Sequence, residues 1–174
     1  MKLDKMTVKL QEALQTALMR ATESGHQQVD PEHLMLAALR QEESILTLAL
    51  DKLGVASFSV IKALEQNLGK KLKVSGDSAQ VYFSPRINKL LAGAAGEAQI
   101  LKDEFISVEH VLLASFNDND SALVKELKKS NVNREKVLQA LALVRGSHRI
   151  TDENPEEKFN ALQKYGQDLT ELAG

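Results

Sequence analysis

The sequence predicts an all-α fold: two tandem four-helix repeats related by a pseudo-twofold axis, with one further helix at the C-terminal end. Three observations support this prediction. Apolar residues recur at the three-and-four spacing of a buried helix face along nearly the whole chain. Residues that cap helices stand in front of these apolar runs. Finally, a shift of 77 residues superimposes the two halves without a gap between Met6 and Leu68.

The first predicted helix lies between Thr7 and Gly25. The Thr7 hydroxyl can accept a hydrogen bond from a free backbone N–H of the first turn, and Gly25 can supply the left-handed residue after the last turn. The predicted buried face follows helical spacing and consists of Val8, Leu10, Leu14, Ala17, Leu18 and Ala21.

The second predicted helix begins with Asp30-Pro31-Glu32, which supplies an N-cap, a proline at the first helical position and an acid at the positive end of the helix dipole. The following segment, 34–39, is apolar nearly all round, so this helix is expected to be central. The first repeat, residues 1–68, is completed by helices at about 44–53, ending at Gly54, and about 57–68, and a polar, Lys-rich loop follows at 69–80.

The second repeat, residues 83–145, matches the first at caps and apolar positions. The matching pairs include Thr7 with Ser84, Leu14 with Leu91, Glu32-His33 with Glu109-His110, Leu36 with Leu113, Ser44 with Ser121 and Val60 with Val137. Because packing dictates the residue type at these positions, the match indicates an internal duplication. The helices around Leu36 and Leu113 are too hydrophobic to face water, so the two repeats are expected to share one core within a domain of residues 1–145.

Beyond this domain the composition changes. Residues 146–155 are polar and predict a flexible linker. Residues 156–174 are helical again in pattern, with apolar marks at Phe159, Leu162, Leu169 and Leu172. The pattern is cut short at the end of the chain, so we expect the chain to be a fragment of a longer protein.

Composition and motifs exclude several functional classes. A net charge of −2 with no basic stripe argues against nucleic acid as a partner. There is no cysteine, which fits a reducing cytosol, and no apolar run of membrane-spanning length or signal core. The chain also lacks a phosphate-binding loop, a nucleophile elbow and a zinc-binding HExxH sequence, so we expect neither a cofactor nor catalysis. For His33 and His110, which the repeat relates, structural packing is favoured over a ligand or catalytic role.

Four sequence strings then resemble the Clp N-terminal repeat family in the form found in ClpB disaggregases. They are 25–34 (GHQQVDPEHL), 81–85 (VYFSP) followed by 88–91 (NKLL), 103–114 (DEFISVEHVLLA) and 162–170 (LQKYGQDLT). The resemblance covers essentially the whole chain, with the strings in the family's order. It identifies residues 156–174 as the start of the segment that leads into the first AAA+ module, which is absent here.

The resemblance implies a non-catalytic module at the N-terminal end of a cytoplasmic, ATP-driven stress chaperone. In that family the full-length protein is a homohexamer that binds ATP and Mg²⁺ and threads aggregated polypeptides through its pore together with the DnaK system. The N-terminal domain engages exposed apolar stretches of unfolded clients, and the isolated fragment is expected to be monomeric. Related Clp unfoldases use the same double repeat to dock adaptor proteins, which is the alternative function.

The resemblance also points to candidate site residues. A polar trio needed for full activity in the family corresponds to Thr7, Asp103 and Glu109, although each of these residues also has a plausible structural role as a cap, a loop brace or an acid at a helix start. The apolar client groove of the family is expected between the repeat-initial helices. Leu14 and Leu91 are its repeat-related candidates, with core packing as the competing interpretation. Gly93 and Gly96 depart from the family pattern and either loosen their helix or deepen a groove beside it.

Overall fold

The computed structural model describes residues 5–73 and 80–146. Of the predicted linker at 146–155 only Gly146 is described, and the predicted C-terminal helix at 156–174 lies outside the described residues. The described chain forms α1 (Val8–Glu23), α2 (Pro31–Leu39), α3 (Ile45–Lys52), α4 (Ser57–Gly69), α5 (Pro85–Ile100), α6 (Val108–Ala114), the short 3₁₀ helix η2 (Ser115–Asn117), α7 (Ala122–Lys128) and α8 (Arg134–Arg145). The all-α prediction is confirmed.

The duplication is visible in where the helices begin. Each of the second four α-helices starts 77 residues after its counterpart: Pro85 after Val8, Val108 after Pro31, Ala122 after Ile45 and Arg134 after Ser57. The caps agree as well, because the hydroxyls of Thr7 and Ser84 both accept from the backbone N–H three residues later, each at 3.2 Å.

Helix ends also correspond, with one difference in residue type. Gly25 and Gly54 end α1 and α3 with positive φ angles of 74° and 72°. Their counterparts in the second repeat, Lys102 and Asn131, take the same left-handed conformation at 60° and 59°. The backbone frame is therefore retained even where glycine is not, at a conformational cost for Lys102.

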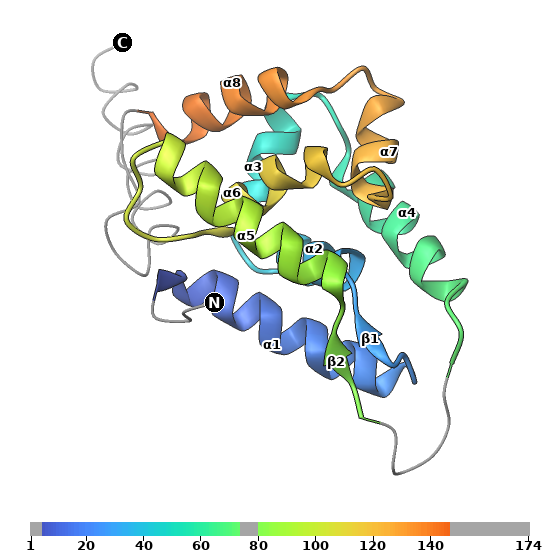
Figure 1. Ribbon diagram of the computed structural model, residues 1–174. Coiled ribbons are helices and arrows are strands. Elements are labelled where there is room, and N and C mark those ends of the chain that lie inside the picture. The colour runs from blue at the N-terminus through green and yellow to red at the C-terminus, as the bar shows by residue number, and fades with distance from the viewer. Residues whose placement is uncertain (1–4, 74–79, 147–174) are drawn as a thin grey trace.

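The two repeats exchange helix contacts across the pseudo-twofold axis. Within each repeat the first two helices pack together, α1 on α2 and α5 on α6. Across the axis α3 packs against α8, and its counterpart α7 packs against α4. Figure 1 shows α2 and α6 in the middle of the molecule, between α1 below and α8 above. Every residue of α2 and of α6 is buried, as the sequence predicts for a central pair.

One hydrophobic core spans both repeats. It takes side chains from all eight α-helices of the described chain, including Leu14, Leu36, Leu91 and Leu113. The prediction of two repeats that share a core is thereby met, since neither repeat closes a core of its own. Two predicted members of the buried face of α1 are wrong: Val8 is only partly buried, and Leu18 is 37% exposed and lies at the border of that face.

Two short parallel pairings, which the sequence did not predict, tie each repeat to the other. β1 (Gln28–Val29) pairs with β2 (Tyr82–Phe83), and Met6 pairs with Ile106. The second pairing is the pseudo-twofold copy of the first. In both, the residue that caps a repeat-initial helix donates its backbone N–H across the axis: Thr7 to the carbonyl of Ile106 at 2.9 Å and Ser84 to that of Val29 at 3.1 Å.

Candidate functional site

The structure places the predicted polar trio inside the molecule. Thr7 and Glu109 have no exposed surface, and the Asp103 side chain is also fully buried. Asp103 and Glu109 belong to one polar cluster, and Thr7 reaches the same region through its backbone hydrogen bond to Ile106. Each residue thus has a structural task, and any action on a partner would pass through the shape of the surrounding helices.

The cluster around Asp103 joins the α5–α6 loop, the start of α6 and the end of α8. One Asp103 oxygen lies 2.7 Å from His110 Nε2 and the other 2.7 Å from Arg145 Nη2. Arg145 Nε is 3.5 Å from a Glu109 oxygen, and Ser107 donates its hydroxyl to Glu109. Because His110 Nδ1 accepts the Ser107 backbone N–H at 2.8 Å, the ring nitrogen that donates to Asp103 is Nε2.

The first repeat fills the equivalent positions with different chemistry. His26 stands where the second repeat has Asp103, and His33 where it has His110. The His33 Nε2 atom lies 2.9 Å from His26 Nδ1, while His33 Nδ1 accepts the Asp30 backbone N–H. Burial first, and then the neighbouring His26, lower the pKa of His33 to about 4, so this pair is neutral near pH 7.

Lys71 adds a charge beside this pair. It forms an ion pair with Asp30 at 2.8 Å. Burial alone would raise the pKa of Asp30, but the hydrogen bonds from Lys71 and Ser84 outweigh it and lower that pKa. Burial also lowers the pKa of His26, assisted by the positive charges of Lys71 and Lys73.

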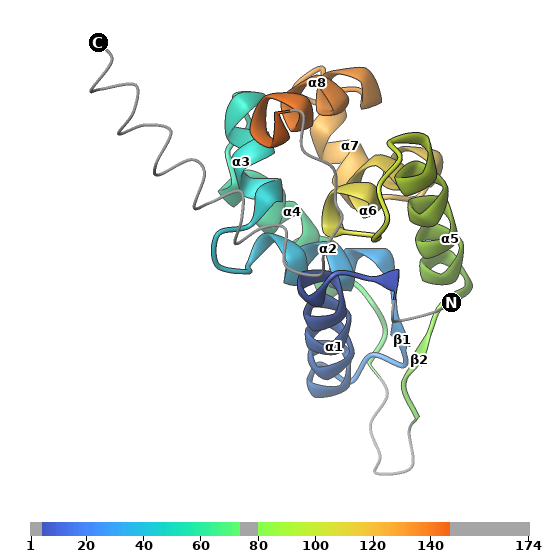
Figure 2. The same cartoon turned by 90° about the vertical axis from the view of Figure 1, so that its left-hand side faces the viewer.

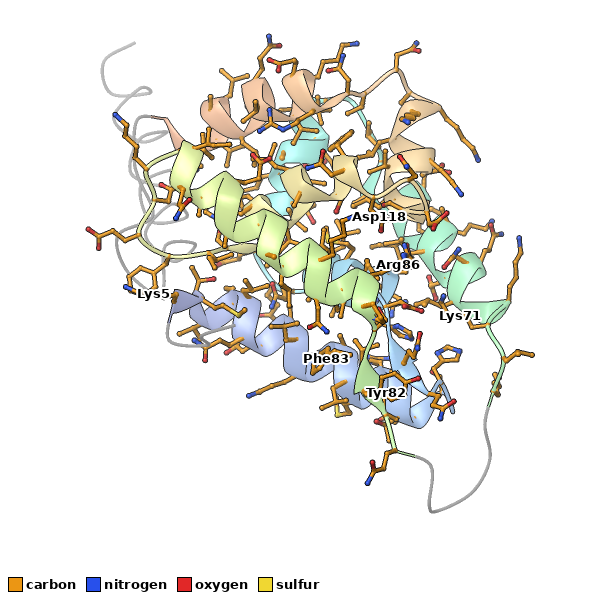
Figure 3. The ribbon with its side chains drawn as sticks, viewed as in Figure 1. Lys5, Lys71, Tyr82, Phe83, Arg86 and Asp118 are labelled. Carbon is orange, nitrogen blue, oxygen red and sulfur yellow. The ribbon has the colours of Figure 1, made fainter. Side chains whose placement is uncertain are left out.

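A third polar group connects the repeats at the start of α5. Arg86 contacts both Glu32 oxygens, at 3.2 and 3.1 Å, and Asp118 at 2.8 Å (Figure 3). Glu32 also accepts the backbone N–H of Ala122 at the start of α7. Glu32 and Glu109 are repeat equivalents, so each central helix carries a buried acid in its first turn, paired with an arginine from elsewhere.

The apolar candidates Leu14 and Leu91 lie at comparable depth, 7% and 6% exposed, as expected for repeat equivalents. Exposed apolar side chains occur on α1 itself and on β2. Leu18 and Met19 on α1 are 37% and 52% exposed, and Tyr82 and Phe83 on β2 are 46% and 37% exposed. We call these four residues the α1–β2 face.

The α1–β2 face comes from segments that are far apart in sequence. β1 packs on α1 and pairs with β2, so β2 lies close to the C-terminal half of α1 (Figure 1 and Figure 2). Gln28 of β1 donates to the Tyr82 hydroxyl at 3.0 Å, which orients that ring. The sequence did not predict this face, because the only signal is the consecutive aromatic pair before Ser84, and the counterpart of Phe83, Met6, is buried.

The described residues were also compared with the requirements of a metal site and of a membrane-spanning helix. Within residues 5–73 and 80–146 no group of three histidine, aspartate or glutamate side chains is arranged to hold a metal ion. Among the helices of the same residues, none combines the length and the apolar character that crossing a membrane requires.

The fold and the positions of these groups define an all-α double-repeat domain. A family model described as the Clp repeat (R) N-terminal domain matches residues 5–130, and the chain belongs to this family. Over 99% of its length the chain is 42% identical to a chaperone protein ClpB of Nitratidesulfovibrio vulgaris, and over 97% it is 37% identical to the ClpB of Bacillus cereus. It spans about a fifth of the length of these relatives.

Solved structures share the fold at lower identity. The Hsp104 N-terminal domain from Candida albicans matches with a TM-score of 0.74 and 18% identity, over 87% of this chain and 99% of that one. The N-terminal domain of the ClpV1 ATPase from E. coli matches with a TM-score of 0.70 and 21% identity, over 87% of this chain and 90% of that one. A ClpV N-domain solved in complex with a VipB peptide matches with a TM-score of 0.59 and 20% identity, over 80% and 86% of the two chains.

The resemblance stated from the sequence is therefore confirmed: the chain corresponds to the N-terminal domain of a ClpB/Hsp104-type chaperone.

Proposed function

We propose that this domain engages exposed apolar segments of unfolded or aggregated polypeptides and passes them to the ATPase ring of a disaggregase. The observation that carries the proposal is the α1–β2 face, where four of the eight exposed large apolar side chains of the described residues come from two segments, α1 and β2; the other four, Phe58, Leu72, Ile100 and Leu143, come from separate segments. Clusters of exposed apolar residues on soluble domains mark sites of interaction. The similarity to ClpB relatives supports the same function.

In this proposal Leu14 supports the exposed residues of α1 from within the core, and Leu91 is its repeat-related counterpart on α5. Thr7, Asp103 and Glu109 contribute by holding the start of α1 and the α5–α6 loop in position across the pseudo-twofold axis. The downstream part of the protein would supply the catalytic activity, binding ATP and Mg²⁺ as a cytoplasmic hexamer that works with the DnaK system. The N-terminal domain itself would be monomeric and without a cofactor.

Adaptor docking is the second candidate function. It is favoured by the fold likeness to a ClpV N-domain that was solved with a VipB peptide. In an adaptor-docking domain, the partner would bind polar outer surfaces and the apolar surface would stay closed.

Affinity for an unfolded client separates the two functions. Met19→Ser and Phe83→Ser change exposed positions and should leave the fold intact, while Leu143→Ser removes an equally apolar side chain, 72% exposed on α8, and serves as the control. Binding to a permanently unfolded, labelled polypeptide should weaken about threefold to tenfold for each of the first two variants, from the loss of buried apolar area. Unchanged affinity in both, with folding preserved, would contradict client binding at this face.

A further inference from the structure

The first repeat contains a cavity that lies against the shared core and has no lining residue in common with the α1–β2 face. It lies between α1, α2 and α4 and has a volume of about 490 Å³, enough for one or two amino-acid residues. Its floor is apolar and its rim is positively charged. The floor residues are Leu36, Ala37 and Leu68, and the cations at the rim are Arg20, Arg40 and Lys73.

The charges at the rim are not balanced. Arg40 is paired with Glu65 at 3.0 Å. Arg20 and Lys73 have no ion pair within residues 5–73 and 80–146. His26 lines the same cavity. Its pKa is lowered first by burial and then by the positive charges of Lys71 and Lys73, so the charge of Lys73 acts on the cavity wall.

The second repeat shows that the fold does not require these cations. The counterpart of Arg20 is Glu97, which pairs with Arg134, and the counterpart of Arg40 is Asn117. The apolar floor is retained only in part: Leu113 and Ala114 occupy the positions of Leu36 and Ala37, whereas Arg145 occupies that of Leu68. Leu36 and Ala37 keep their residue types because the packing around them is shared, whereas Arg20 and Arg40 are cations in the first repeat alone and call for a different explanation.

We propose that this cavity binds a peptide segment that carries a carboxylate next to an aliphatic side chain. The aliphatic group would rest on Leu36, Ala37 and Leu68, and the carboxylate would meet Arg20 and Lys73 at the rim. The carboxylate can come from the end of a polypeptide or from an acidic side chain, and both sources offer the same chemistry to the two cations. This site is separate from the α1–β2 face, so it gives the domain a second, charge-selective contact with a polypeptide.

Three short peptides test the proposal. The first ends in two leucines with a free carboxylate, the second is the same peptide with a C-terminal amide, and the third is an amide with a glutamate before the leucines. Binding to the full 174-residue chain is followed by NMR chemical shifts and quantified as a dissociation constant. The free-carboxylate or the glutamate peptide, or both, should bind about fivefold or more tightly than the neutral amide, with shifts at α1, α2 and α4 that diminish in high salt.

Variants locate the site. Arg20→Gln and Lys73→Gln should each weaken binding of the anionic peptide about fivefold. Thr16→Leu adds bulk from α1 at the cavity wall and should obstruct the aliphatic group. The control is Lys89→Gln, because Lys89 is an exposed cation on α5 that lines a cavity of the second repeat. It should bind like the unchanged protein.

The relative affinity of the two anionic peptides identifies the source of the carboxylate. Equal binding of the anionic and neutral peptides would overturn the proposal, as would binding of none of them, or loss of binding only in Lys89→Gln. Met19→Ser and Phe83→Ser should leave these peptides unaffected, so failure at this cavity can be told apart from failure of client binding at the α1–β2 face.

Discussion

The two repeats place different chemistry on the same frame. Beneath the second central helix, Asp103, Glu109 and Arg145 form a charged cluster around His110. Beneath the first, the equivalent space holds a neutral pair of rings, His26 and His33. The histidine in the first turn of the central helix is common to both, and in both it accepts a backbone N–H from the N-cap residue. The comparison indicates that both repeats require the hydrogen bond from the N-cap backbone to this histidine, whereas the charge of the group that pairs with the histidine differs between the repeats.

The largest expected effect comes from breaking the charged cluster. Arg145→Met leaves Asp103 and Glu109 buried without their cation, so the free energy of unfolding should fall by about 3–5 kcal/mol. His26→Leu disrupts the polar pair of the first repeat, removes a neutral group and should cost only about 2 kcal/mol. Urea denaturation of both variants measures the difference. Equal losses would show that the two clusters contribute alike and would remove the contrast.

Truncation of the repeat-related leucines should come next. Leu91→Ala and Leu14→Ala each leave a cavity at a position that is 6% or 7% exposed and should lose about 2–3 kcal/mol, a little below the range for fully buried leucines. Because the pseudo-twofold axis relates the two sites, the losses should agree to within about 1 kcal/mol. Thermal unfolding of both variants tests this, and a loss confined to one of them would mean that the repeats do not share the core equally.

A smaller effect on the free energy of unfolding is expected from pH, through the histidine pair of the first repeat. The folded-state pKa of His33, about 4, lies below the ordinary histidine value of 6.5, so the unfolded chain binds more protons between these two values. The stabilisation is complete above pH 6.5 and is lost as the pH falls toward 4. The free energy of unfolding should therefore drop by about 1–3 kcal/mol over this window, with His26 contributing in the same direction.

His33→Gln provides the test, because glutamine retains a hydrogen-bonding group but does not titrate. Its stability should vary less between pH 6.5 and 4.5 than that of the unchanged protein. Parallel pH profiles for the two would place the titrating group elsewhere.

The smallest effect concerns the two glycines of α5. A Cβ at Gly96 would meet no heavy atom within 4 Å, so Gly96→Ala should stabilise by up to about 1 kcal/mol through helix propensity. At Gly93 a Cβ would approach the Ala114 Cβ to 3.3 Å, so Gly93→Ala should gain less. Gly93 thus allows α5 to approach α6 closely, while Gly96 occupies open surface. A larger gain at Gly93, measured by thermal unfolding, would contradict this assignment.

The sequence predicted the parts of the fold that depend on local chemistry. Capping by Thr7 and Ser84, the left-handed Gly25 and the burial of α2 and α6 all follow from residue type and spacing within one segment. The cross-axis strand pairs were missed because each is two residues long and its partner belongs to the other repeat.

The site was harder to predict for the same reason. Arg145 meets Asp103 across 42 residues of sequence, which no spacing rule anticipates. Leu18 was assigned to the buried face, but that face is too narrow to include it. The 77-residue shift does align His26 with Asp103, so the sequence contained a signal for equivalent polar clusters, although not for the pairing of either residue.

The most direct test of the central proposal is an NMR titration of this chain with an unfolded client polypeptide. Client binding at the α1–β2 face predicts shift changes that concentrate at Leu18, Met19, Tyr82 and Phe83, with the Phe83→Ser variant losing most of them. Shift changes confined to α7 and α8, or to polar outer surfaces away from α1 and β2, would contradict the proposed function and favour adaptor docking instead.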